Sequence, residues 1–215
     1  LASLTWAFAG VLNPAMSQLH AFVSEYSARD QPWRYLFQTT DVIMGTLLCL
    51  AGLATLVWAR HRPLGRQGWS GVGFVAGGFF SVLDALVTMD CSPTRSQACM
   101  AAEEAGHVSV NHVVHVGTST IVVVGFALPI LLLNSTMTRF RGFGLVVTWA
   151  WVVFTLLNGI GAVGWFVGTP MDYTGIWQRF SLGLGTLWWL ILAADDIVTA
   201  RVQDRALLLS SLTRS

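Results

Sequence analysis

Long apolar runs separated by short polar connectors constrain this chain more than any other feature. About 20 apolar residues in a helix cross the hydrocarbon core of a bilayer, and six segments approach that length. They are Leu1–Leu19, Tyr35–Trp58, Trp69–Met89, His112–Leu133, Phe143–Val167 and Trp177–Val198. Because the connectors are short, we expect consecutive helices to pack as antiparallel neighbours. The sequence therefore predicts an all-α fold, a six-transmembrane-helix bundle that forms one polytopic membrane domain over residues 1–215.

Composition agrees with a lipid environment. Charged residues make up 11% of the chain, whereas soluble globular domains carry about 25%. Ten tryptophans and 21 glycines fit the same interpretation, because Trp is enriched at membrane interfaces and Gly is frequent in membrane helices. Gly73 and Gly77 form a GxxxG pair, which favours close approach of two helices. The net charge of +1 gives no reason to expect nucleic acid as a partner.

The distribution of arginine predicts the orientation. Two connectors and the C-terminal tail, all on one side of the predicted bundle, contain Arg60, Arg62, Arg66, Arg139, Arg141, Arg201, Arg205 and Arg214. The opposite side contains Arg29, Arg34, Arg95 and Arg179. The positive-inside rule then places both termini in the cytoplasm. We expect a multi-pass protein of the plasma (inner) membrane whose site faces outside.

Two cysteines support the same orientation. Cys91 and Cys99 lie in one connector, which the arginine rule places outside. Disulfides persist in oxidising compartments, so we expect these two residues to form a disulfide. Two free thiols are the alternative.

A layer of polar residues interrupts the predicted spans in the half nearest the Cys91–Cys99 connector. Its members are Ser81, Asp84, His115, Ser119, Asp41, Asn158, Gln178 and Arg179. At a rise of about 1.5 Å per residue, Asp41, Asp84 and His115 all lie roughly 9 Å deep. Polar groups inside a membrane are costly and tend to be functional, so we expect a cavity that opens outward. The alternative is that the charges only pair, for instance Arg179 with Asp41 or Asp84.

The stretch HVSVNHVVHVGTST, residues 107–120, places three histidines at the start of the fourth predicted span. His112 and His115 are three residues apart and share a helix face, and His107 could fold back over them. Imidazoles with one carboxylate form a common catalytic zinc set, with water as the fourth ligand. The predicted metal ligands are therefore Asp84, His107, His112 and His115, and the predicted catalytic residues are Ser81, Asp84, His115 and Ser119. Two alternatives stay open: acid–base or hydrogen-bonding histidines without a metal, and simple interface residues.

Glu25 and Tyr26 lie in an aromatic segment before the second predicted span. That segment is nearly long enough to fold over the cavity as a lid. We therefore expect Glu25 to join the polar layer and contact a substrate.

Several motifs together resemble a known family. FVSEYSARDQPW, DVIMG, SVLDALVTMDCSPTRSQAC and HVVHVGTST resemble an actinobacterial-type branch of the integral-membrane family called domain of unknown function 998. The resemblance runs from about Phe22 through the last span and implies a membrane fold. The Asp and His pattern is also faintly similar to the ceramidase and receptor superfamily of membrane hydrolases. That similarity implies a Ser, an Asp and three His around zinc.

Three functions follow from these features. The first is an outer-face hydrolase of a lipid or lipid-linked ester with a zinc cofactor, in which a metal-bound water attacks the carbonyl. The second is a non-enzymatic protein that binds membrane lipid or stabilises a partner. The third is a small proton-coupled transporter with Asp84 and His115 as a relay, against which the scarcity of polar residues in the inner half argues. The sequence leaves the oligomeric state open.

Overall fold

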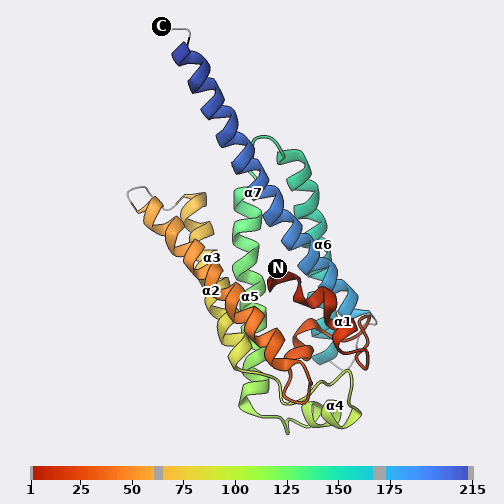
Figure 1. Ribbon diagram of the computed structural model, residues 1–215. Helices are drawn as coiled ribbons and strands as arrows, with labels where there is room; N and C mark the ends of the chain where they lie inside the picture. The colour runs from red at the N-terminus through yellow and green to blue at the C-terminus, as the bar shows by residue number, and fades with distance from the viewer. Residues whose placement is uncertain (1, 61–64, 167–172, 213–215) are drawn as a thin grey trace.

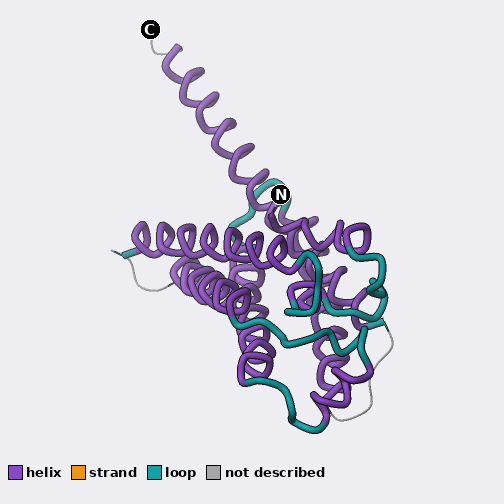
Figure 2. The backbone as a smooth tube through the Cα atoms, turned by 60° about the horizontal axis from the view of Figure 1, so that its bottom comes forward, coloured by secondary structure: helices purple, strands orange, loops and turns teal. Residues whose placement is uncertain are grey.

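The computed structural model describes residues 2–60, 65–166 and 173–212, and these residues form helices and loops without a β-strand (Figures 1 and 2). The all-α prediction is confirmed. In chain order the elements are the 3-10 helix η1 (Ala2–Phe8), α1 (Ala9–Leu12), the 3-10 helix η2 (Val23–Ser27), α2 (Arg34–Ala59), α3 (Arg66–Leu86), α4 (Gln97–Glu104), α5 (Val110–Leu133), α6 (Arg141–Phe166) and α7 (Thr174–Leu212).

Five helices in the described part of the chain are long and apolar enough to cross a membrane: α2, α3, α5, α6 and α7. Their surfaces carry many exposed large apolar side chains, such as Leu47 on α2 and Trp149 on α6. In a protein surrounded by water such surfaces would be costly, whereas lipid tails cover them without penalty. The chain is therefore a multi-pass membrane protein.

The first predicted span is different in the structure. Residues 2–12 form η1 and the short helix α1, and residues 13–19 lie in turns, so this segment is not a membrane-crossing helix. The cause is local, because Pro14 disfavours the helical conformation for the residue before it, and Asn13 has φ −136° and ψ 78°. Leu1 and Val167, at the ends of two predicted spans, lie outside the described residues, as do Arg62 and Arg214. The cytoplasmic placement of both termini stays a prediction.

Glycines bring α2, α3 and α5 into backbone contact. A Cβ atom built on Gly78 of α3 would lie 2.5 Å from the carbonyl oxygen of Gly45 on α2. One built on Gly125 of α5 would lie 2.5 Å from the Cα atom of Gly77 on α3. The predicted GxxxG pair, Gly73 and Gly77, therefore lies in the α3–α5 interface. This close packing fixes the polar residues of α3 against those of α5.

A second core joins α5, α6 and α7. Trp188 of α7 is fully buried and packs with Ile130 of α5 and Trp151 of α6. Its indole N–H donates to the side-chain oxygen of Asn134, 3.2 Å away. Two turns beyond Trp188 on α7, Asp195 accepts hydrogen bonds from the backbone N–H groups of residues 138–140. Asp195 therefore holds the α5–α6 connector and lies outside the polar layer.

The disulfide end of the bundle holds α4, residues 87–109 and residues 13–33. In Figure 1 this end is at the bottom, and α7 extends past the other helices at the opposite end. η1 contacts both α2 and α7, and the start of the described chain lies about midway along the helices (Figure 1). Ala9, Ala21 and Tyr26 are buried against Phe37 of α2. The segment before α2 is thus packed into the fold.

Candidate functional site

The α3–α5 interface brings Asp84, His115 and Ser119 together near the disulfide end. His115 Nδ1 lies 3.2 Å from Asp84 Oδ1. The Ser119 hydroxyl donates to both carboxylate oxygens of Asp84, at 2.9 and 3.1 Å. Thr118, which the sequence analysis did not single out, donates its hydroxyl to the same carboxylate. One carboxylate therefore organises three side chains of α5.

The surroundings of His115 define its tautomer. Its Nδ1 faces the backbone oxygens of Asp84 and Val87 at 3.1 and 3.0 Å, besides the Asp84 carboxylate. The two backbone oxygens cannot donate, and the Asp84 carboxylate accepts from Thr118 and Ser119, so the proton of a neutral ring resides on Nδ1. Nε2 then carries a free lone pair, and it is buried without a hydrogen-bond partner among the described residues. A buried imidazole nitrogen with a free lone pair can accept a proton.

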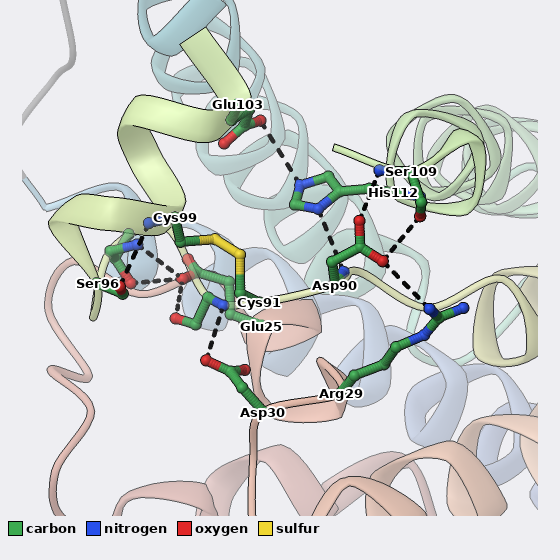
Figure 3. The surroundings of a disulfide bond; sticks show 12 residues. Glu25, Arg29, Asp30, Asp90, Cys91, Ser96, Cys99, Glu103, Ser109 and His112 are labelled. Atoms are coloured by element: carbon green, nitrogen blue, oxygen red, sulfur yellow. Dashed lines mark hydrogen bonds and ion pairs between the residues drawn. A yellow bond between two sulfur atoms is a disulfide. The ribbon is translucent and has the colours of Figure 1, made fainter. Parts of the chain in front are cut away.

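His112 has the opposite tautomer and different partners (Figure 3). The backbone N–H of Asp90 donates to its Nδ1 at 3.2 Å, so the ring proton of the neutral form resides on Nε2. That nitrogen faces Glu103 Oε1 of α4, 3.9 Å away. His112 and His115 share a buried face of α5 as predicted. They nevertheless face separate carboxylates, Glu103 on α4 and Asp84 on α3.

The predicted zinc ligands do not converge. Nδ1 of His112 is engaged by a backbone N–H and Nδ1 of His115 by oxygens. His107 is exposed, because Gly106, at φ 69°, ends α4 and the His107 N–H donates back to the Ala102 oxygen. Across the described residues, no three His, Cys, Asp or Glu side chains are grouped to hold a metal ion. The described residues therefore do not bring the predicted ligands together, and zinc binding stays a prediction.

Asp90 fixes the start of α5. Its carboxylate accepts from the Ser109 backbone N–H at 2.6 Å and from the Ser109 hydroxyl at 2.8 Å, and Arg29 lies 3.3 Å away. Partial burial acts in the opposite direction, but these hydrogen bonds and the Arg29 charge hold the pKa of Asp90 below its ordinary value. Asp90 thereby holds the helix that carries both buried histidines.

Glu25 joins two segments of the disulfide end. It is fully buried in η2, and its carboxylate accepts from the Ser92 and Thr94 hydroxyls and from two backbone N–H groups (Figure 3). Burial raises the pKa of Glu25, and these hydrogen bonds offset part of that increase. The structure places Glu25 in a cross-link between residues 22–25 and the disulfide loop. Its predicted substrate contact stays untested.

The disulfide between Cys91 and Cys99 is present, with Cα atoms 5.9 Å apart (Figure 3). It connects the end of α3 to α4, whose first turn is capped by the Ser96 hydroxyl. Cys99 is buried. The prediction from the cysteine spacing is confirmed.

The remaining predicted residues of the layer are dispersed. Asp41 is exposed on α2, close enough for its charge to act on that of Asp84. Ser81 is partly exposed one turn before Asp84, and Asn158 on α6 has a buried side-chain oxygen without a described partner. Gln178 accepts from the Val23 backbone N–H at 2.5 Å.

Arg179 pairs with the N-terminal segment. Its Nη1 donates to the backbone oxygens of Gln18, Ala21 and Gly175 at 2.8 to 2.9 Å. The alternative in which it pairs with Asp41 or Asp84 is therefore wrong. Carbonyl oxygens of a packed loop supply acceptors that the sequence pattern does not reveal.

Comparisons with known proteins define the family. The profile described as "Protein of unknown function (DUF998)" matches residues 1–195. No curated protein and no solved structure matches the chain, so the faint similarity to ceramidases gains no support. The matched range contains every helix except the C-terminal part of α7. The chain belongs to the DUF998 family of proteins of unknown function.

Proposed function

We propose that this protein is a membrane-embedded hydrolase of lipid esters, with His115 as general base and Asp84 as the group that orients it. The observation that carries the proposal is the free Nε2 lone pair of His115 beside an oriented Nδ1–Asp84 pair. This is the arrangement in which a carboxylate holds an imidazole in the tautomer that accepts a proton. The cysteine and arginine patterns support an outward-facing site.

In the proposed reaction, Nε2 of His115 takes a proton from a water molecule as the water oxygen adds to the ester carbonyl. The bond to the leaving alcohol then breaks, and the imidazolium returns the proton to that alcohol. Asp84 stabilises the transient positive charge, while Thr118 and Ser119 hold the carboxylate in place. The products are a free acid and an alcohol. Because the predicted zinc ligands do not converge, no step is assigned to a metal ion.

Lateral access from the bilayer suits the location of these residues. Asp84 is the third residue from the end of α3 and His115 is the sixth residue of α5. At about 1.5 Å per residue both lie within roughly 9 Å of the helix ends, the level of lipid ester groups. Leu86 and Val114, which flank them in sequence, are exposed to lipid.

The test uses purified protein in nanodiscs with 4-methylumbelliferyl acyl esters as probes. Replacing His115 by Gln should lower the rate about 100-fold or more, the usual contribution of a general base. Asp84→Asn should also lower it. His20→Gln is the matched control, since His20 is exposed and stacks on Tyr173. A wild-type protein without turnover, or a His115→Gln variant as active as wild type, would refute the proposal.

A second candidate is a lipid-binding membrane protein without catalysis. This candidate is favoured by an apolar groove between η1 and α7, whose lining includes one charged residue, Arg179. The proton-coupled transporter has no comparable support. In the part of the chain that the structure describes, Asp195, the buried acid near the other end, is occupied by backbone N–H groups.

A further inference from the structure

A groove of about 330 Å³ separates η1 from α7. Trp6 forms one wall, and Ile176, Phe180, Gly183 and Leu187 form the other. These α7 positions are spaced by four, three and four residues, so they form one stripe along the helix. The volume lies within the range of about 300–1,000 Å³ typical of small-molecule sites. The stripe starts at the disulfide end of α7 and runs toward the middle of the membrane-spanning segment.

Two buried donors in the lining lack an acceptor. Nε1 of Trp6 and Nε of Arg179 are both buried and have no hydrogen-bond partner among the described residues. Arg179 is only 9% exposed. Buried donors are nearly always paired, and an unpaired one costs about 1–3 kcal/mol. Both donors therefore call for a ligand that brings acceptor oxygens.

The end of the groove that Arg179 lines is positively charged. The Arg179 guanidinium binds backbone carbonyls and the Tyr26 hydroxyl, and it forms no salt bridge with a described carboxylate. Among the described residues, Glu25 is the acid whose charge acts on it, and Glu25 is already engaged by Ser92 and Thr94. An anion can therefore add a favourable interaction without displacing an existing ion pair.

We propose that the groove binds one anionic phospholipid, with an acyl chain along Gly183 and Leu187 and a headgroup or ester oxygen on Arg179 and Trp6. The apolar stripe matches the acyl chain, and the two donors match the oxygens. Phe180 and Leu187 are 48% and 37% exposed, so the groove is open to the surrounding bilayer. Binding does not depend on ester hydrolysis, because Asp84 and His115 lie on other helices.

The experiment measures lipid binding to delipidated protein by native mass spectrometry, with dioleoyl phosphatidylglycerol and dioleoyl phosphatidylcholine as probes. Wild type should bind one phosphatidylglycerol in preference to phosphatidylcholine. Gly183→Leu should weaken phosphatidylglycerol binding by about tenfold or more, which corresponds to ~1.4 kcal/mol. A Cβ atom at Gly183 would have its nearest contact at 3.6 Å, on Trp6. The variant therefore fills the groove without disturbing the helix.

Two further variants serve as a control for glycine replacement and as a test of the Trp6 donor. Gly159→Leu on α6 is the control, since a Cβ atom there meets nothing within 4 Å; it should bind as wild type does. Trp6→Phe keeps an aromatic side chain but removes the donor, and it should weaken binding of both lipids.

Three results would overturn the proposal. They are equal binding of the two lipids, full binding by Gly183→Leu, and an experimental structure of the full-length protein with protein residues in the groove.

Discussion

The contact between Gly125 on α5 and Gly77 on α3 allows a quantitative test of the packing that creates the Asp84–His115 pair. A Cβ atom on Gly125 would lie 2.5 Å from the Cα and N atoms of Gly77 and 3.1 Å from the oxygen of Gly73. All three are backbone atoms, so no side chain can rotate away. Carbon atoms pack at about 3.5–4.0 Å. Gly125→Ala must therefore move α3 and α5 apart by roughly 1 Å.

Gly117 is the matched control on the same helix. A Cβ atom there would meet nothing within 4 Å, and alanine is favoured over glycine inside a helix by about 1 kcal/mol. Overpacking typically costs about 1–3 kcal/mol. Because both substitutions lie inside α5, the preference for alanine cancels between them. The free energy of unfolding of Gly125→Ala should therefore lie below that of Gly117→Ala by about 1–3 kcal/mol, the cost of overpacking.

Reversible unfolding in mixed micelles with increasing SDS, followed by tryptophan fluorescence, measures this difference. Gly125→Ala should unfold at a lower SDS fraction than wild type, and Gly117→Ala at an equal or higher one. Equal stability of the two variants would mean that the α3–α5 backbones are not in contact, and the reasoning that places Asp84 beside His115 would fail.

Three other measurements address the disulfide end. Because folding lowers the pKa of Asp90, its ionised form stabilises the fold above its ordinary pKa of about 4. That stability is lost as pH falls through the lower folded pKa. Hydrogen exchange at the start of α5 should therefore rise as pH falls across this window, and Asp90→Asn should remove this pH dependence. Treatment with a thiol reductant should add two hydrogen atoms to Cys91–Cys99, seen by intact mass, and cost about 2–3 kcal/mol of stability, whereas an unchanged mass would exclude the bond. Single cysteines at Arg66 and Ser96 should be labelled from opposite sides of the membrane, and external labelling of Arg66 would refute the orientation.

Local pattern was sufficient for much of the fold. Five of the six predicted spans correspond to helices, because a run of apolar residues needs no particular neighbour to be stable in lipid. The disulfide was predictable for a similar reason, since its cysteines are eight residues apart in one connector. The prediction of a membrane-spanning helix over residues 1–19 was wrong because it rested on apolar composition and neglected the helix break at Asn13–Pro14.

The candidate site was predictable only in part. Depth along the helices correctly placed Asp84 near His115, because the rise per residue is constant and both lie on neighbouring helices. The depth of a residue in the membrane does not tell toward which neighbouring helix its side chain points. The spacing of His112 and His115 therefore could not reveal that one ring faces Asp90 and Glu103 while the other faces Asp84.

Hydrophobicity and helical period are properties of single segments, so the sequence alone predicts the five long apolar helices and the GxxxG pair of Gly73 and Gly77. The partner of each polar group instead depends on how the segments pack. Glu25 meets Ser92, and Arg179 meets the carbonyl oxygen of Gln18, across 67 and 161 residues respectively. Such pairings depend on how loops fold back over the helix ends. A buried hydrogen bond forms wherever packing brings a donor to an acceptor, whatever their separation in the chain.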